Sequence, residues 1–113
     1  MSAPYTTGQA CQSTVITANT AGQQLCLTAA NQPAAPVVPT CSGWLHSIVL
    51  SADTTAQTIS IFDGTSTGGT LRAKVVTPTA VTPVTLTFDV QYFIGMFLVL
   101  SGATTANITV VWE

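Results

Sequence analysis

The chain has 113 residues, of which 47% are hydrophobic and 5% are charged, and its formal net charge at pH 7 is −2. A chain of this length can bury the core of one domain, and so low a charge excludes disorder caused by charge repulsion. Nucleic-acid binding is excluded too, because it requires a basic surface and the only cations are Arg72 and Lys74.

No segment has the composition of a membrane anchor or a leader. The longest apolar run lies at about residues 94–100, far short of the roughly 20 residues of a spanning helix. The first ten residues, MSAPYTTGQA, lack the basic and apolar regions of a secretory signal peptide. We therefore expect no membrane partner.

Residues 1–42 are rich in Ala, Thr and Gln and contain two short segments with strand character, at residues 13–17 and 24–28. The connector NQPAAPVVPT follows, with a proline at every third position, which favours an extended, polyproline-like chain. We interpret residues 1–42 as an extended N-terminal arm that either adds to the domain after it or reaches a neighbouring subunit.

The three cysteines, Cys11, Cys26 and Cys41, are evenly spaced. An odd number excludes a complete set of internal disulfides, and the spacing does not match the closely paired ligands of a zinc site. Buried free thiols in a reducing compartment are the favoured interpretation. A single Cys11–Cys41 or Cys11–Cys26 bridge is the alternative, so we expect at most one disulfide and no metal.

Residues 43–113 predict a β-sandwich domain. Thr, Val and Ile are frequent and turn signals recur at short intervals, which is typical of a sandwich or barrel. Six strands are expected here, at residues 43–51, 58–62, 70–76, 84–90, 95–101 and 106–112.

Alternation of apolar and polar residues predicts which side chains face inward. In WLHSIVLS the bulkier face, with Trp44, His46, Ile48 and Leu50, is expected to face the core, and VTLTFDV shows the clearest alternation. The predicted core consists of Trp44, Ile48, Leu50, Ile59, Ile61, Leu86, Phe88, Leu98, Leu100, Ile108 and Val110.

Two stretches are nearly the same, VLSADTTAQTISIF at residues 49–62 and VLSGATTANITVVW at residues 99–112. Each predicts two strands joined by a hairpin turn. Between them DGTSTGGT predicts a glycine-rich loop, and Pro78 and Pro83 mark a crossover connection. The whole pattern predicts an all-β fold, a single antiparallel β-sandwich, jelly-roll-like, with about eight strands and the N-terminal arm.

The sequence contains no recognisable catalytic constellation. His46, the only histidine, is interpreted as a packed residue, and a nucleophilic Cys41 near it would lack a third group. Asp53 and Asp63 fall at turns, where such side chains bond their own backbone, and a single carboxylate such as Asp63 would make only a weak calcium site. We therefore expect no enzymatic activity, no catalytic residues, no cofactor and no metal.

The segment FIGMFLVL is apolar on both strand faces, which predicts either a central strand or a strand whose outer face meets a partner, and the low charge favours a partner. One of these faces can be buried in the core, but the second needs another sheet, the arm or a neighbouring subunit. We therefore expect a homo-oligomer.

Residues 43–113 resemble small β-sandwich virion proteins of tailed bacteriophages. The resemblance rests on the stretches GWLHSIVLSADTTAQTISIFDGTSTGGTLRAKV and FDVQYFIGMFLVLSGATTANITVVWE, with their glycine-rich loop, an F-D strand and a last segment ending I-T-V-x-W-E. It implies a capsid decoration (cement) protein, assembled in the host cytoplasm, that binds the major capsid protein and forms a trimer. The alternative is a tail or fibre component that binds a host-surface glycan through Trp44, Tyr92 or Trp112.

Overall fold

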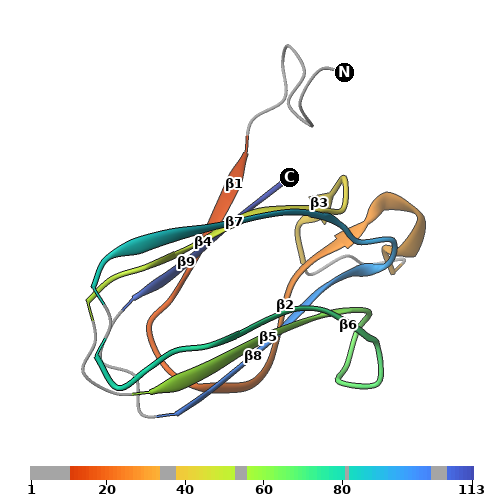
Figure 1. Ribbon diagram of the computed structural model, residues 1–113. Helices are drawn as coiled ribbons and strands as arrows, with labels where there is room; N and C mark the ends of the chain where they lie inside the picture. The colour runs from red at the N-terminus through yellow and green to blue at the C-terminus, as the bar shows by residue number, and fades with distance from the viewer. Residues whose placement is uncertain (1–10, 34–37, 53–55, 81, 103–106) are drawn as a thin grey trace.

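The computed structural model of the chain describes residues 11–33, 38–52, 56–80, 82–102 and 107–113. These residues form two β-sheets packed face to face (Figure 1). The four-stranded sheet has the order β1 (Gln12–Ile16), β9 (Ile108–Trp112), β4 (Trp44–Leu50) and β7 (Val84–Gln91). The five-stranded sheet has the order β3 (Thr40–Cys41), β2 (Thr20–Thr28), β8 (Gly95–Gly102), β5 (Gln57–Asp63) and β6 (Thr70–Val76), and one 3-10 turn, η1 (Ala29–Asn31), follows β2.

The strand pairing is that of a jelly roll. β5 pairs with β6, β4 with β7, β2 with β8 and β1 with β9, all antiparallel, as in one long hairpin. The hairpin is rolled up so that β4 also pairs with β9 and β5 with β8. The predicted all-β sandwich and its eight strands are confirmed; β3, which pairs in parallel with β2, was not predicted.

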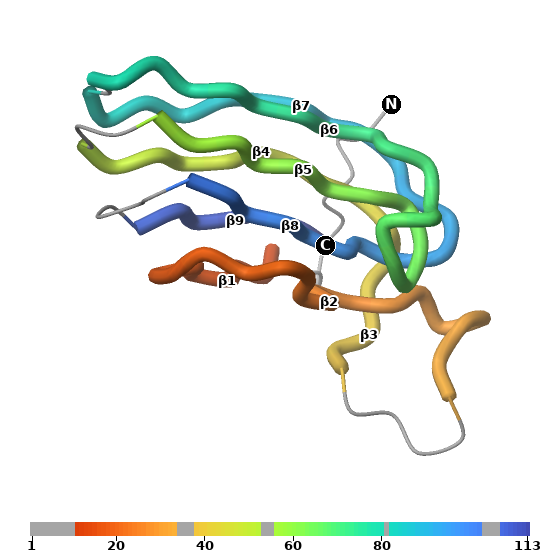
Figure 2. The backbone as a smooth tube through the Cα atoms, turned by 90° about the horizontal axis from the view of Figure 1, so that it is seen from below, coloured from red at the N-terminus to blue at the C-terminus, as the bar shows by residue number. Residues whose placement is uncertain are grey.

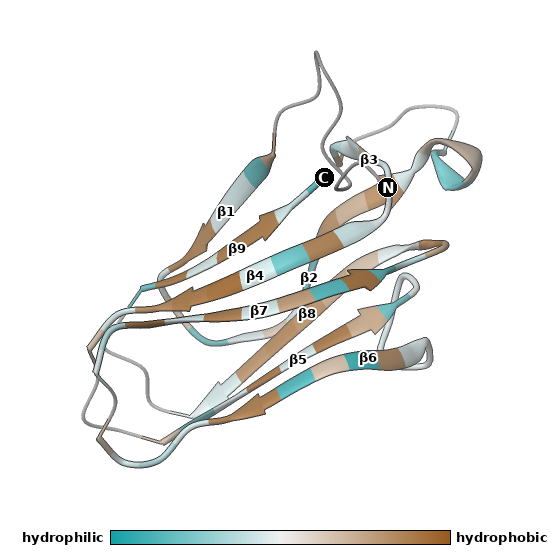
Figure 3. Cartoon of the chain, turned by 45° about the horizontal axis from the view of Figure 1, so that its top comes forward, coloured by the Kyte–Doolittle hydropathy of each residue, from teal (hydrophilic) through white to brown (hydrophobic). Residues whose placement is uncertain are grey.

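The core lies between the inner faces of the two sheets, as the alternation of apolar and polar residues along the strands shows (Figure 3). Of the predicted core, Ile48, Leu50, Ile59, Ile61, Leu98, Leu100, Ile108 and Val110 are buried. Leu86 and Phe88 on β7 are only half-buried, because β7 is the last strand of its sheet.

The predicted orientation of β4 is wrong at its N-terminal end. The register of β4 shifts between Leu45 and Ser47 against both of its neighbours. Such a bulge interrupts the alternation of side chains between the two faces, so Leu45 and His46 are both buried while Trp44 is half-exposed.

The two similar stretches are not hairpins, as predicted, but arches between the sheets. The first runs from β4 in one sheet to β5 in the other, and the second runs back from β8 to β9. The strands that flank the two connections lie side by side, since Leu50 pairs with Ile108 and Ile59 with Leu100. The Thr-Thr pair of each stretch falls in residues 53–55 and 103–106, outside the described residues.

Of the two placements expected for residues 1–42, the described residues from 11 to 33 and from 38 to 42 show the first, because they add to the sandwich. β1 pairs with β9 and β2 with β8, and Ile16, Leu25 and Leu27 are buried in the molecule. The predicted boundary at residue 42 therefore does not separate two structural units. Residues 1–10 and the middle of the proline-rich connector, residues 34–37, lie outside the described residues.

Candidate interaction surface at an open edge of the sandwich

β6 and β7 are the last strands of the two sheets and lie on the same side of the molecule, one above the other (Figure 2). Leu86, Phe88 and Val90 on β7 point inward but stay half-buried. Opposite them, β6 supplies the small Ala73 and the half-buried Val75. The inner face of the sandwich is thus incompletely covered along this side, which we call the open edge: β6, β7 and the turn residues Phe93 and Ile94.

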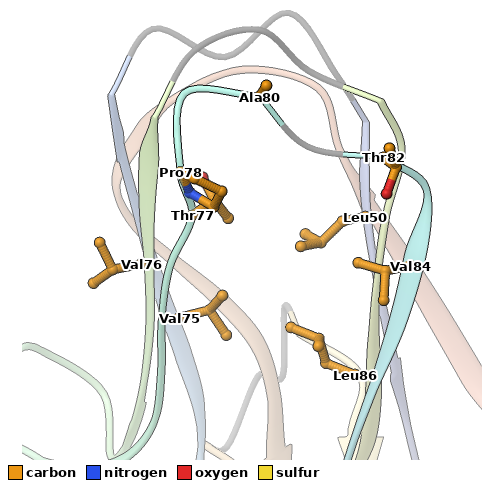
Figure 4. A pocket seen from close by; sticks show the side chains of 9 residues that line it. All are labelled: Leu50, Val75, Val76, Thr77, Pro78, Ala80, Thr82, Val84 and Leu86. Carbon is orange, nitrogen blue, oxygen red and sulfur yellow. The ribbon is translucent and has the colours of Figure 1, made fainter.

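An apolar pocket of about 350 Å³ lies at one end of the open edge. Val75 from β6 and Leu86 from β7 point toward the space between them, and Leu50 and Val84 line the same space (Figure 4). The remaining lining residues are Val76, Thr77, Pro78, Ala80 and Thr82 from the end of β6 and the crossover after it. The pocket continues the half-buried core face outward between the two strands.

Most of the exposed large apolar side chains gather at this edge. Among the described residues they are Val15, Leu71, Val76, Val84, Phe93 and Ile94. All except Val15 belong to β6, β7 or the turn that follows β7. A cluster of exposed apolar residues, unlike scattered ones, marks an interaction site.

The exposed charges among the described residues lie on the same two strands. Arg72 and Lys74 are on β6, and Asp89, with a side chain 54% exposed, is on β7. The Arg72 guanidinium lies over the Phe93 ring, 5.6 Å from its centre, a stabilising contact between a cation and an aromatic face. Asp53 lies outside the described residues.

Asp63, at the end of β5, holds the turn after β7. Its carboxylate accepts hydrogen bonds from the backbone N–H groups of Phe93 (3.0 Å), Ile94 (2.8 Å) and Gly95 (3.3 Å). Arg72 Nε lies 3.7 Å from the same carboxylate. Asp63 was predicted to bond its own turn and, less favourably, to bind calcium. Its carboxylate oxygens instead accept N–H bonds from the turn after β7 and so hold that end of the open edge in place.

Tyr92 anchors the same turn from inside the molecule. Its hydroxyl donates to the Ile61 carbonyl oxygen at 3.1 Å, and its side chain is fully buried. Burial, together with the nearby Asp63 carboxylate, raises the pKa of the Tyr92 hydroxyl well above its usual value. The phenol is therefore held neutral.

His46 lies between two carboxylates. Its Nδ1 is 3.2 Å from Asp89 Oδ1 and its Nε2 is 3.3 Å from Glu113 Oε2. Each ring nitrogen of His46 therefore has a carboxylate oxygen within hydrogen-bond distance. His46 and Glu113 are buried, and this trio, which the sequence did not predict, joins β4, β7 and the chain end after β9.

The cysteine prediction is partly wrong. Cys26 on β2 and Cys41 on β3 form a disulfide, with Cα atoms 5.8 Å apart, and Cys11 is a free, exposed thiol. Neither predicted pairing occurs, because β2 and β3 lie side by side while Cys11 precedes β1 in the other sheet. A cysteine in a disulfide cannot act as a nucleophile, so Cys41 is excluded from that role. The expectation of a reducing compartment rested on unpaired thiols, and the disulfide removes that argument.

The aromatic residues expected to contact a glycan are not arranged for it. Tyr92 and Trp112 are 1% and 3% exposed, and the Trp112 Nε1–H group donates to Thr14 Oγ1 at 3.0 Å. Trp44 is half-buried. A sugar has no access to the first two rings.

Comparison with protein-family models, curated proteins and solved structures finds no match. Among the described residues, no helix is long and apolar enough to cross a membrane, and no group of three or more His, Cys, Asp or Glu side chains is arranged to hold a metal ion.

Proposed function

We propose that the chain is a structural virion protein that decorates the capsid of a tailed bacteriophage and stabilises it by bridging neighbouring capsomers. Its partner is then the major capsid protein, its location is the virion after assembly in the host cytoplasm, and its working form is a homo-oligomer, with a trimer favoured by the resemblance. The protein catalyses no reaction in this role.

The observation that carries this proposal is the open edge. A subunit that assembles on a protein shell needs, on the single folded chain, an accessible apolar surface through which it contacts another subunit. Leu71, Val76, Val84, Phe93 and Ile94 supply one, next to an apolar pocket.

The low charge supports the same role. With a net charge of −2, copies of the chain repel one another little and can be packed closely on a shell. Jelly rolls are common in capsid proteins, but also in lectins and cupins, so the fold alone does not decide the function. The glycan-binding alternative is not favoured, since Tyr92 and Trp112 are buried.

The proposal is tested by counting copies in particles. In purified virions of a phage whose genome encodes this chain, quantitative mass spectrometry should find it in a number comparable with that of the major capsid protein. Particles lacking the chain should lose their shells at a lower temperature. A few copies per particle, at the tail alone, would support the fibre alternative, and absence from the virion would refute both.

A further inference from the structure

We propose that the open edge binds the open edge of a second copy of this chain, with β6 of each copy lying antiparallel beside β7 of its neighbour. This inference deepens the proposed function, on which it rests only in taking the chain to act as an assembled subunit. Because the contact uses both edge strands of both copies, it closes at a dimer, in place of the trimer that the resemblance favours. The four-stranded sheet of one copy would then continue into the five-stranded sheet of the next.

The open edge has what strand pairing between copies requires. Within the described part of the chain, β6 and β7 each have a pairing partner on one side only, so the other side of each strand presents N–H and C=O groups that another strand can bind. A second copy would also cover the half-buried Leu86, Phe88 and Val90 and the exposed apolar residues beside them. β1, at the opposite edge, exposes only Val15 among the large apolar residues described.

The charges select one of two possible orientations. A two-fold axis perpendicular to the sheets would place β6 beside β6 and β7 beside β7. This arrangement brings Arg72 and Lys74 close to the same cations of the other copy. An axis along the strands places β6 beside β7, and these strands run in opposite directions (Figure 3). The second arrangement sets the cationic strand beside the exposed Asp89, and opposite charges on adjacent strands attract while like charges repel.

The same axis fixes which residues meet. Val75 and Leu86 face each other across the pocket, at about the same height along the strands (Figure 4). A rotation about an axis along the strands preserves this height, so Val75 of one copy lies level with Leu86 of the next. Counting one residue away from this pair in opposite directions places Lys74 beside Thr87. Arg72 and Asp89 follow farther along in the same direction, each next to a register shift of its own strand, so the two charges lie near each other.

The test uses single cysteines placed on the two strands, in full-length Cys11→Ser protein that keeps the Cys26–Cys41 disulfide. Lys74 and Thr87 are both exposed, so Lys74→Cys and Thr87→Cys leave the core intact. After mild oxidation, the mixture of the two variants should give a disulfide-linked dimer of twice the chain mass on a non-reducing gel. Each variant alone should give little of it.

A matched control replaces β6 by the opposite edge. Val15 on β1 is also exposed, and the mixture of Val15→Cys with Thr87→Cys should not cross-link above the level of Thr87→Cys alone. Because the cysteines of the test pair are on different molecules, no bond within one chain can imitate the result.

Each other outcome overturns the proposal. A dimer from Lys74→Cys alone or from Thr87→Cys alone would mean that like strands meet. No cross-link in any mixture would mean that Arg72, Lys74 and Asp89 keep edges apart, as charges on edge strands often do. The experiment contains no capsid, so its failure leaves capsid binding open, and absence of the chain from virions leaves the β6–β7 contact standing.

Discussion

At the residue scale, the structure gives its few charged and polar groups structural tasks. Asp63 and Tyr92 both act on the turn that ends at Gly95, one from its carboxylate and one from its hydroxyl. His46 joins two carboxylates from other parts of the chain. These contacts position the apolar turn residues of the open edge.

We expect Asp63→Ala to lower the free energy of unfolding by about 2–4 kcal/mol, because it leaves backbone donors near Ile94 and Gly95 without an acceptor. Asp63→Asn keeps one acceptor oxygen and should cost less. Urea unfolding of the three proteins measures both. Equal stability of Asp63→Ala and the parent protein would contradict the role assigned to this carboxylate.

Tyr92 predicts a loss of stability at alkaline pH. Its hydroxyl has a pKa raised in the folded state above the ordinary value of 10.0, so the unfolded chain releases this proton first. The stabilisation is complete below about pH 10 and is lost as pH rises above it. In a Cys11→Ser background, urea unfolding between neutral and alkaline pH should show a decline that Tyr92→Phe reduces; identical profiles would refute this explanation.

Part of this pattern could be predicted from the sequence. Alternation in QTISIFD places Asp63 on the same face as Ile59 and Ile61, so its burial was foreseeable, but its acceptance of N–H bonds from residues 93–95 depends on the tertiary fold. The bulge in β4 gave no signal, because Trp44, Leu45 and His46 each suit a buried site.

At the scale of elements, the strands of residues 11–42 complete the sandwich. A chain that begins at residue 43 would lack β1, β2 and β3. The strands β9 and β8 would then become edge strands, and the core would lose Ile16 and Leu25. We expect it to lose cooperative thermal unfolding, as measured by circular dichroism. A chain lacking only residues 1–10 is the control and should retain it. A cooperative transition in the shorter chain would restore the arm interpretation.

The Cys26–Cys41 disulfide fixes the short β3 strand beside β2. It closes a loop with a sequence separation of 15, for which the entropy model gives a stabilisation of about 3 kcal/mol. We expect Cys26→Ala/Cys41→Ala to lose about that amount in denaturant unfolding. The parent protein after reduction should behave in the same way, and an unchanged midpoint in both would contradict a stabilising role.

Elements were easier to predict than their pairing. Eight strands followed from alternation and turn residues, because both signals are local. The arches were mistaken for hairpins because the same small residues between strands suit a turn within one sheet and a passage between two. The open edge could not be located from the sequence, since it depends on which strands end the sheets. β8, whose two apolar faces suggested a partner, lies centrally between β2 and β5.

At the scale of the whole molecule, the exposed apolar residues and the exposed charges lie together on one side of a low-charge jelly roll. The site was predicted only in general terms, as a need for cover by another subunit. The sequence pointed to β8, whereas the structure shows most of the exposed large apolar residues on β6, β7 and the turn after β7. This surface supports the proposal that the chain acts as an assembled subunit.

The most direct test of this account is the mass of the full-length protein in solution, measured by sedimentation velocity from micromolar to millimolar concentration. The contact between open edges predicts a mass at least twice the 11.6 kDa of one chain. It also predicts that salt weakens the association, because screening weakens the contact between Arg72 and Asp89 of adjacent copies. A mass of 11.6 kDa at every concentration and every salt concentration would contradict the central claim.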